Sequence, residues 1–307
     1  MSKQFPHAID NSMRKELVKC ETAAMYKYEM GLRPLDEQRV DLHAGKAFAT
    51  GMEAMRRSYY EQGLNQYDSL QAGVKALYAA YGSFIPPLKS NKTADRMAGA
   101  LAFYAEQCPL DDEKLTPIRF PDGTFGIETS FSFDLPIQHP DTGKNLVYCG
   151  RFDMLALDEN KDVWIVDDKT SSQMGDKWAN QYLLDSQVTG YCMGVTRLLK
   201  QHGLVNEVKG AVINGIAIRL RDYEHKRINA YRQDWEIDRW YKQMLADVHR
   251  WRDAYVSDCH NQALDHACAQ YNNPCEYSPL CKSRNPERLI DGSYIVKFWN
   301  PVTREEG

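Results

Sequence analysis

The feature that most constrains the fold is a run of alternating residues that begins at Ile127 and ends at Ile137. Bulky or β-branched side chains take every second position and polar side chains fall between them, which is the period of a strand buried on one face. Two more strand patterns follow at 146–157 and 163–166, after the turn residues of 140–143. Because short turns join them, the middle of the chain predicts consecutive antiparallel strands.

Helical patterns flank these strands on both sides. They cover 11–30, 36–62, 70–81, 94–106, 180–200 and 234–255, and two further strand patterns cover 208–219 and 226–233. This order indicates an α/β sandwich with a mixed sheet. We expect three regions, which are an N-terminal helical region at 1–110, an α/β core at 111–257 and a cysteine-rich tail at 258–307.

The composition excludes several classes of protein. The 307 residues are 43% hydrophobic and 26% charged, which is ordinary globular usage and excludes a disordered or low-complexity chain. The formal charge of −4 gives no global basic field, so nucleic-acid binding requires a local patch. No apolar run approaches the roughly 18 residues of a membrane span, and the first residues lack the apolar core of a signal peptide, so we expect a cytoplasmic protein.

Three residues at the ends of the central strands carry the strongest chemistry. Asp153 falls in the second strand, and Asp167 and Lys169 end the third, two positions apart and therefore on one face. A hairpin can bring the two carboxylates together, and the backbone carbonyl of Asp168 can face the same site. Hard oxygen ligands of this kind suit Mg²⁺ or Mn²⁺. A neighbouring lysine can position water and stabilise charge on a phosphate.

These segments resemble a known family. GRFDML at 150–155 and IVDDKTSS at 165–172 resemble the core of the PD-(D/E)XK nuclease superfamily, in its RecB-like exonuclease branch. That branch carries Gln-x-x-x-Tyr on the next helix, and Gln187 and Tyr191 match it. The resemblance implies a restriction-endonuclease-like core, a mixed sheet flanked by helices, and a metal-dependent DNA exonuclease. It also implies residue roles: metal ligation by Asp153 and Asp167, steering of the nucleophile by Lys169, and organisation of the site by Gln187 and Tyr191.

Two positions leave the details of the resemblance open. Glu128 matches a glutamate at the start of the family's first strand and is either part of the metal site or a solvated strand carboxylate. The family's Gly-x-x-x-His motif matches at Gly45, but Ala49 stands at the histidine position. His43 lies before the glycine, and Glu53 lies one turn beyond Ala49. The number of metals therefore stays open, and so does a non-catalytic DNA-end-binding scaffold.

The cysteines form a second pattern. Three crowd the tail and one lies in the first helical segment, in the order Cys20, Cys268, Cys275 and Cys281. The short C-x-x-C spacing of structural zinc sites is absent. The layout resembles iron–sulfur nucleases of the RecB-like branch and implies a [4Fe–4S] cluster, with zinc in the same four thiolates as the alternative. We expect the remaining cysteines to be mostly buried hydrophobes, namely Cys108, Cys149, Cys192 and Cys259.

A basic segment at 219–232 interleaves cations with Tyr223 and Tyr231. Such a pattern suits contact with a nucleic-acid backbone and its bases, although a solvated hairpin explains it equally well. The candidate DNA contacts are Arg219, Arg221, Lys226 and Arg227. The resemblance further implies DNA ends as substrate, a recombination or replication protein as partner, and the cytoplasm of a bacterium or a bacterium infected by phage as location. A structure-specific endonuclease stays an alternative activity.

Overall fold

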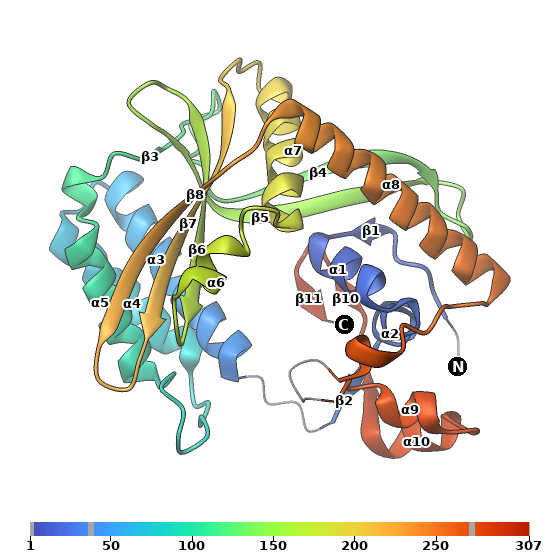
Figure 1. The fold of residues 1–307 in the computed structure, drawn as a ribbon. Helices are drawn as coiled ribbons and strands as arrows, with labels where there is room; N and C mark the ends of the chain where they lie inside the picture. The colour runs from blue at the N-terminus through green and yellow to red at the C-terminus, as the bar shows by residue number, and fades with distance from the viewer. Residues whose placement is uncertain (1–2, 36–39, 270–273, 307) are drawn as a thin grey trace. The chain divides into compact units, whose positions relative to one another are not determined.

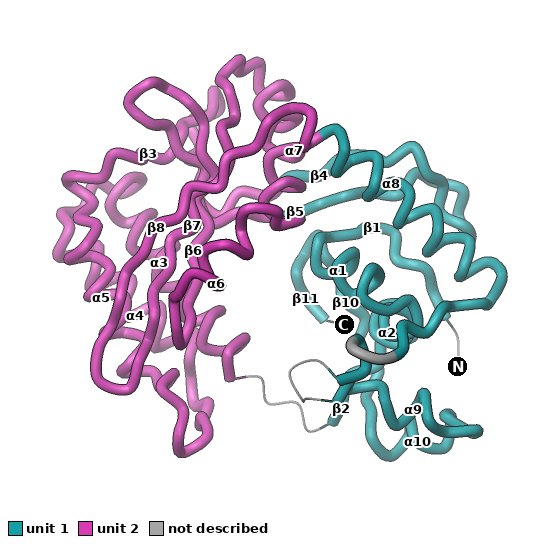
Figure 2. The backbone as a smooth tube through the Cα atoms, in the orientation of Figure 1, with its two compact units in different colours: residues 1–38, 131–150, 238–307 teal, residues 39–130, 151–237 magenta. Residues whose placement is uncertain are grey.

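The computed structural model describes residues 3–35, 40–269 and 274–306, which fall into two compact units (Figures 1 and 2). Each unit combines stretches that are far apart in the sequence. Unit 1 contains 1–38, 131–150 and 238–307, and unit 2 contains 39–130 and 151–237. The three-region division expected from the sequence stays a prediction.

Unit 2 is built on a mixed sheet, as the sequence predicts. Its strands are β5 (Asn145–Leu157), which enters from unit 1, β6 (Val163–Ser171), β7 (Val208–Ile218) and β8 (Tyr223–Tyr231). β5 runs antiparallel to β6, β6 runs parallel to β7, and β7 runs antiparallel to β8. The short β3 (Thr116–Pro117) pairs with the end of β5.

Strands β5 and β6 part partway along their length. Their ladder pairs Leu157 with Val163 and ends where Met154 pairs with Val166. The ladder between β6 and β7 continues to the pair of Ser171 and Ala217. Beyond Val166, β6 is therefore bonded along β7, and its edge toward β5 is left without a ladder.

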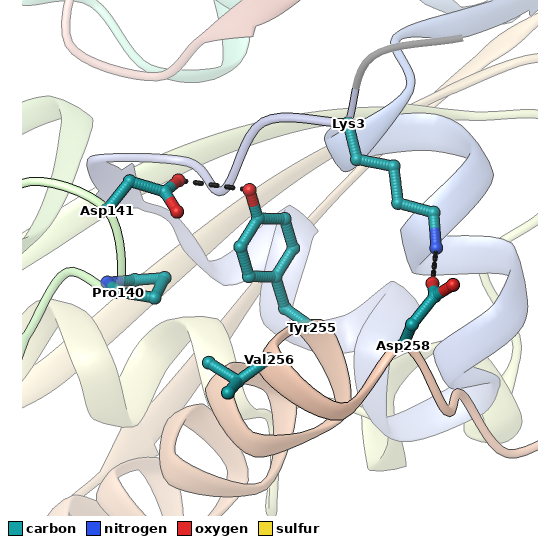
Figure 3. Close-up of a pocket in the computed structure, with 6 residues that line it drawn as sticks. All are labelled: Lys3, Pro140, Asp141, Tyr255, Val256 and Asp258. Atoms are coloured by element: carbon teal, nitrogen blue, oxygen red, sulfur yellow. Dashed lines mark hydrogen bonds and ion pairs between the residues drawn. The ribbon is translucent and has the colours of Figure 1, made fainter.

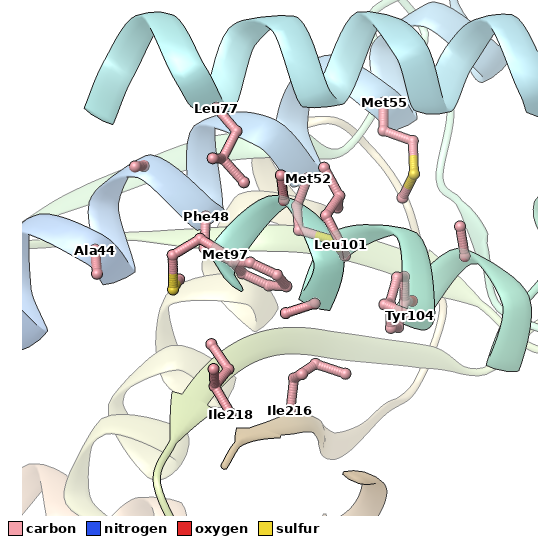
Figure 4. Close-up of a cluster of buried hydrophobic side chains, with 14 of the residues drawn as sticks. Ala44, Phe48, Met52, Met55, Leu77, Met97, Leu101, Tyr104, Ile216 and Ile218 are labelled. Atoms are coloured by element: carbon pink, nitrogen blue, oxygen red, sulfur yellow. The ribbon is translucent and has the colours of Figure 1, made fainter. Parts of the chain in front are cut away.

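Three helices cover one face of this sheet. They are α3 (Val40–Tyr60), α4 (Gln66–Tyr81) and α5 (Ala94–Gln107), and Thr93 and Asn65 cap α5 and α4 with side-chain oxygens. Figure 4 shows their shared core, in which Phe48, Met52 and Leu101 pack with Ile216 and Ile218 of β7. The apolar residues recur every three or four positions, so α3 and α5 turn one stripe toward the sheet and α4 turns its stripe toward α3 and α5. Residues 36–39 of the helix expected at 36–62 lie outside the described residues.

The helix expected at 180–200 is two helices. The short α6 covers Asp176–Asn180, and α7 covers Ser186–Gln201. Asp185 separates them because its carboxylate accepts hydrogen bonds from the backbone N–H groups of Gln187 (2.6 Å) and Val188 (3.2 Å). This N-cap satisfies donors that a helix start leaves unpaired, so a new helix begins there.

Unit 1 gathers both ends of the chain. β1 (Ala8–Ile9) runs parallel to β5 at Val147 and Tyr148, β4 (Ile127–Gln138) pairs with β5, and β2 (Leu32–Pro34) pairs antiparallel with β9 (Tyr294–Val296). The long helix α8 covers Asp234–Ser257 and starts in unit 2. The remaining elements are η2 (Leu110–Asp112) in unit 2, and η3 (Asp265–Cys268), α9 (Ser278–Lys282), α10 (Glu287–Ser293), β10 (Trp299–Asn300) and β11 (Glu305–Glu306) in unit 1.

The first helical segment is broken, in contrast to the single helix expected at 11–30. α1 (Asn11–Lys19) ends at Cys20, whose backbone is extended, and α2 (Glu21–Ala24) and the π-helix η1 (Met25–Glu29) follow. Thr22 and Glu21 both bond to the backbone of Asn261. These tertiary bonds outweigh the local helical preference.

No helix within residues 3–35, 40–269 and 274–306 is long and apolar enough to cross a membrane.

We expect Gly73→Ala to destabilise unit 2. A Cβ at Gly73 would lie 2.7 Å from the carbonyl oxygen of Gly51 and 2.9 Å from the Cβ of Met55, so helices α3 and α4 would have to move apart. Overpacking of this kind costs about 1–3 kcal/mol, measurable by urea denaturation. The same substitution at Gly292, where no atom lies within 4 Å of the new Cβ, is the control and should be neutral or slightly stabilising. Equal stabilities of the two variants would contradict the tight approach.

Candidate active site

The predicted acidic and lysine residues lie together in unit 2. Asp167 and Lys169 project from one face of β6, and Lys169 Nζ lies 2.9 Å from Asp167 Oδ1 and 2.7 Å from Oδ2. Asp167 is 5% exposed, whereas the side chain of Lys169 keeps 34% of its surface in solvent. The site therefore joins a buried carboxylate to an accessible cation.

Asp153 faces this pair across the gap between β5 and β6. The backbone N–H of Asp168, which no ladder to β5 uses, donates to Asp153 Oδ2 at 2.7 Å. Burial, and then the charges of Asp167 and Asp168, raise the pKa of Asp153 to about 8. Burial also raises the pKa of Asp167, although Lys169 opposes that shift. Two carboxylates in this environment repel each other unless a positive charge lies between them.

Lys169 stays protonated in this setting. Burial opposes the charge of the ammonium, but the negative charges of Asp167 and Asp153 outweigh it and raise the pKa of Lys169 above its usual value. A lysine held in its charged form can donate hydrogen bonds and stabilise an anion. It cannot act as a general base.

The two aspartates fit a divalent cation that also binds water and substrate. In residues 3–35, 40–269 and 274–306, no three His, Cys, Asp or Glu side chains form a group able to hold a metal ion by themselves. Mg²⁺ commonly uses one or two carboxylates and completes its shell with waters and phosphate oxygens. Asp153 and Asp167, buried and mutually repulsive, provide such a partial set.

The side chain of Asp168 is directed away from this pair. It is 2% exposed and accepts from Arg56 Nη1 at 2.6 Å, Arg56 Nη2 at 3.0 Å and Asn214 Nδ2 at 2.8 Å. Both of its oxygens are thus engaged on the helix-covered face of the sheet. Sequence analysis missed Arg56 as its partner. A charged residue on a strand face that helices cover requires such a partner, and that requirement was the available signal.

Glu128 lies at the start of β4, beside Asp153. Its carboxylate is 7% exposed, so it is not the solvated alternative, and it pairs with Arg151 Nε at 2.8 Å. Its charge contributes to the raised pKa of Asp153. The backbone of Glu128 has a φ of +49°, and Arg57 bonds to the preceding carbonyl of Ile127 at 2.9 Å. Residues held in this left-handed region cluster at functional sites, and a role in metal binding stays a prediction.

Gln187 and Tyr191 form the pair that their spacing predicts. Gln187 Nε2 donates to the hydroxyl of Tyr191 at 2.8 Å, one turn along α7. Burial, and then the charge of Asp167, raise the pKa of Tyr191, which places this ring near the acidic pair. Tyr191 also packs edge-on against Phe152, the neighbour of Asp153 on β5.

Helix α3 brings no histidine to the site. Gly45 packs close to Thr170 of β6, where a Cβ would lie 3.9 Å from the hydroxyl oxygen. His43 is committed elsewhere, because its Nε2 lies 2.9 Å from the Tyr81 carbonyl and its ring stacks on Phe84. Glu53 pairs with Arg57 at 2.9 Å. Both side chains thus have partners on or near α3, and a role of Glu53 at the site stays a prediction.

The basic segment on β7 and β8 is partly neutralised. Arg219 forms ion pairs with Asp222 and Glu224, and Arg227 forms ion pairs with Glu113. Tyr223 lies under the guanidinium of Arg96, 4.1 Å from ring centroid to cation, rather than open for base stacking. Arg221 is exposed and Lys226 is half-buried, and in the described part of the chain neither has an ion-pair partner.

The four predicted cluster cysteines lie in unit 1. Burial raises the pKa of Cys281, and the charges of the other three cysteines raise it further. The backbone N–H of Cys275 donates to the carbonyl of Cys268 at 2.8 Å, and Cys20 and Cys275 pack on the core of Tyr277 and Leu280. The thiols thus gather in one region, but no three of them reach metal-binding distance among the described residues. Of the other cysteines, Cys108, Cys149 and Cys192 are buried as expected and Cys259 is exposed.

A separate hollow in unit 1 contains none of the predicted site residues (Figure 3). Lys3 pairs with Asp258, and the hydroxyl of Tyr255 bonds to Asp141 Oδ2 at 3.0 Å. Its charged groups are therefore engaged with partners inside the hollow, and the hollow suggests no ligand.

The protein combines a mixed sheet, flanked by helices, with two buried aspartates and a lysine where two strands stop pairing. This arrangement is that of a hydrolytic nuclease. The sequence agrees, because residues 12–282 match the model of the family described as the PD-(D/E)XK nuclease superfamily. The chain belongs to the PD-(D/E)XK nuclease superfamily. Nucleases of this superfamily typically use Mg²⁺ or Mn²⁺, and membership implies DNA as the substrate.

One solved structure is similar in fold, and a second match is weaker. A protein from Eubacterium rectale described as a candidate exonuclease shares 13% identity, with a TM-score of 0.50 over 90% of this chain and 94% of its own. The structure of SSO0001 shares 14% identity over 76% of this chain and 84% of its own, with a TM-score of 0.32. No curated protein matches the sequence.

We expect the metal-free chain to lose stability as the pH rises. An aspartate in an unfolded chain ionises near pH 4, whereas Asp153 in the folded chain retains its proton up to about pH 8. Between these values the native state binds more protons than the unfolded state, so the free energy of unfolding falls by up to about 1.4 kcal/mol per pH unit. Asp153→Asn should remove this slope and be the more stable protein at pH 8 in chelator.

Urea denaturation at pH 5 and pH 8 measures this difference. Asp134→Asn, which changes an exposed aspartate of β4, is the control and should follow the wild type. Parallel pH curves for the wild type and Asp153→Asn would show that Asp153 is ionised in the native state.

Proposed function

We propose that the chain is a Mg²⁺- or Mn²⁺-dependent deoxyribonuclease that acts as an exonuclease on DNA ends. The observation that carries the proposal is the contact of Lys169 with Asp167, beside Asp153, in the gap between β5 and β6. The resemblance to the RecB-like branch and the likeness to a candidate exonuclease support the exonuclease activity. The reaction is hydrolysis of a phosphodiester by water.

The residues of the site have two kinds of role, which are binding of the metal ion and stabilisation of charge. Asp153 and Asp167 would hold the cation, with Glu128 and the carbonyl of Asp168 as further oxygens. A bound divalent ion supplies an activated water and neutralises charge on a phosphate oxygen. Lys169, held protonated by the two aspartates, orients the attacking water as a donor and stabilises charge on the phosphate. Gln187 and Tyr191 hold the wall of the site beside Asp167.

The segment at 219–232 supplies the DNA contact in this proposal. Arg221 and Lys226 offer their charges directly, since neither has an ion-pair partner among the described residues. Arg219 and Arg227 would first exchange a carboxylate for a phosphate. Such contacts follow the backbone and carry no sequence preference. A recombination or replication protein in a bacterial cytoplasm is the partner and setting that we propose from the family resemblance.

We expect Lys169→Ala to fold and to lose cleavage. The side chain is one-third exposed, so its loss leaves no large cavity, whereas the charge that stabilises the reacting phosphate disappears. End-labelled linear DNA, single- and double-stranded, is incubated with Mg²⁺, Mn²⁺ or chelator, and a drop of at least about 100-fold is expected. Lys200→Ala, an exposed lysine on α7, serves as the matched control.

The same assay separates the alternatives. An exonuclease needs an end, so circular single-stranded DNA should survive, and its cleavage would identify an endonuclease. Tight binding of DNA ends without metal-dependent cleavage would favour the non-catalytic scaffold, for which Ala49 at the histidine position would be the reason. Cleavage by Lys169→Ala at the wild-type rate would refute the proposed active site.

We further propose that Cys20, Cys268, Cys275 and Cys281 hold a [4Fe–4S] cluster, with zinc as the alternative occupant. The proposal is supported by the charges of Cys20, Cys268 and Cys275, which raise the pKa of Cys281. Four thiolates are the ligand set of such a cluster. It would tie the first helical segment of unit 1 to the tail.

Metal content tests the cluster directly. Protein purified without oxygen should be brown and contain about four irons per chain, and Cys281→Ser should lower both the iron content and the unfolding temperature. Cys259→Ser is the control, because Cys259 is an exposed cysteine outside the set. One zinc per chain with no iron would replace the cluster by a zinc site.

A further inference from the structure

We propose that Asp168 is a positioning residue for the metal site and that Arg56 and Asn214 act through it. The inference rests on the proposed function, since it concerns the orientation of Asp153 as a metal ligand. Sequence analysis placed Asp168 at the site through its carbonyl. The hydrogen bonds give its side chain and its N–H a different task.

Asp168 is held in two directions, in the plane of the sheet through its N–H and toward the helices through its carboxylate. On one side its N–H donates to Asp153 Oδ2 at 2.7 Å. On the other side its carboxylate takes two bonds from Arg56, at 2.6 and 3.0 Å, and one from Asn214 at 2.8 Å. The bond to Asp153 occupies one lone pair of Oδ2 and fixes the plane of that carboxylate, so that its other oxygen has a defined direction.

The position in the sheet explains why such a hold is needed. The β5–β6 ladder ends at the pair of Met154 and Val166, so from Asp167 on the β5 side of β6 has no backbone partner. The ladder to β7 alone leaves this stretch free to shift toward or away from β5. The bonds from α3 and β7 to the Asp168 carboxylate restrict that movement.

The bonding partners are themselves oriented. The amide oxygen of Asn214 lies 2.8 Å from His225 Nε2 and 3.3 Å from Arg227 Nε, which directs its NH₂ group to Asp168. Arg227 in turn pairs with Glu113. The network therefore extends over α3, β6, β7 and β8, and the Arg227 that the sequence assigns to DNA belongs to it.

Stability alone gives little reason for this buried pair. The side chains of Arg56 and Asp168 are each 2% exposed, and well-packed apolar residues in place of a buried ion pair are often as stable or more so. An apolar pair, in contrast, makes no hydrogen bonds that could fix the orientation of a carboxylate and its peptide. Removal of both charges together therefore distinguishes a positioning role from a purely structural one.

The test compares Mn²⁺ binding with stability in the absence of DNA. The double variant Arg56→Met/Asp168→Leu replaces both charged side chains by apolar ones, and Mn²⁺ binding is measured by the electron paramagnetic resonance of free Mn²⁺. We expect a modest fall in its unfolding temperature, because the buried Asn214 Nδ2 loses its acceptor, while its Mn²⁺ affinity falls by about tenfold. Met55→Leu, a swap on the same helix, should leave both quantities unchanged.

A second variant keeps the test valid if the double variant does not fold. Arg56→Lys retains the buried charge but cannot bond both carboxylate oxygens in the fork geometry, so a smaller loss of Mn²⁺ affinity is expected. With active protein, the loss should appear in kcat rather than in the KM for DNA. Wild-type Mn²⁺ affinity in a folded variant of either kind would overturn the positioning role.

The proposed function fails in a different way. A wild-type chain that binds Mn²⁺ but cuts no DNA overturns the nuclease proposal and leaves the difference between the variants intact. An Asp153→Asn variant that keeps the wild-type Mn²⁺ affinity overturns the positioning proposal, because Asp153 would then not be a ligand.

Discussion

The parting of β5 and β6 is the constraint on which the site depends. Where two strands are paired, their backbone N–H and C=O groups bond to each other, and no N–H is left for a side-chain carboxylate. Past Val166 the ladder stops, and the freed N–H of Asp168 takes a side-chain acceptor, Asp153, in place of a carbonyl. The sheet thereby opens just where Asp167 and Lys169 project from one face.

The charges on the two faces of β6 have different functions. Toward the gap, Asp153 and Asp167 are buried, and the positive charge beside them does not fully offset their burial. The pKa of each is raised for this reason. Toward the helices, Asp168 is fully compensated by Arg56 and Asn214. One face thus carries carboxylates with too little positive charge, and the other carries a carboxylate whose charge is balanced. Alternation along β6 is enough to turn Asp167 toward Lys169 and Asp168 toward Arg56 and Asn214.

The sequence predicted the central strands because their alternation is strong and their turns are local, and the spacing of Gln187 and Tyr191 predicted a contact that the structure contains. It could not predict the break at Cys20 or the start of α7 at Asp185, because tertiary bonds and a cap decided them. It also missed Arg56, since 112 residues separate this arginine from Asp168. Local patterns identified the residues of the candidate site, but long-range pairing decides which of them have free oxygens.

The composition of unit 1 has a consequence for biosynthesis. Unit 2 ends at residue 237, so all of its residues are synthesised before residues 238–307. Unit 1 needs those residues, because β2 near the amino end pairs with β9 near the carboxyl end. Domains generally fold as units during synthesis. β2 must therefore wait for its partner strand while the unit that carries the acids and the lysine is completed, and Leu32, which is buried in the folded chain, stays exposed during that interval.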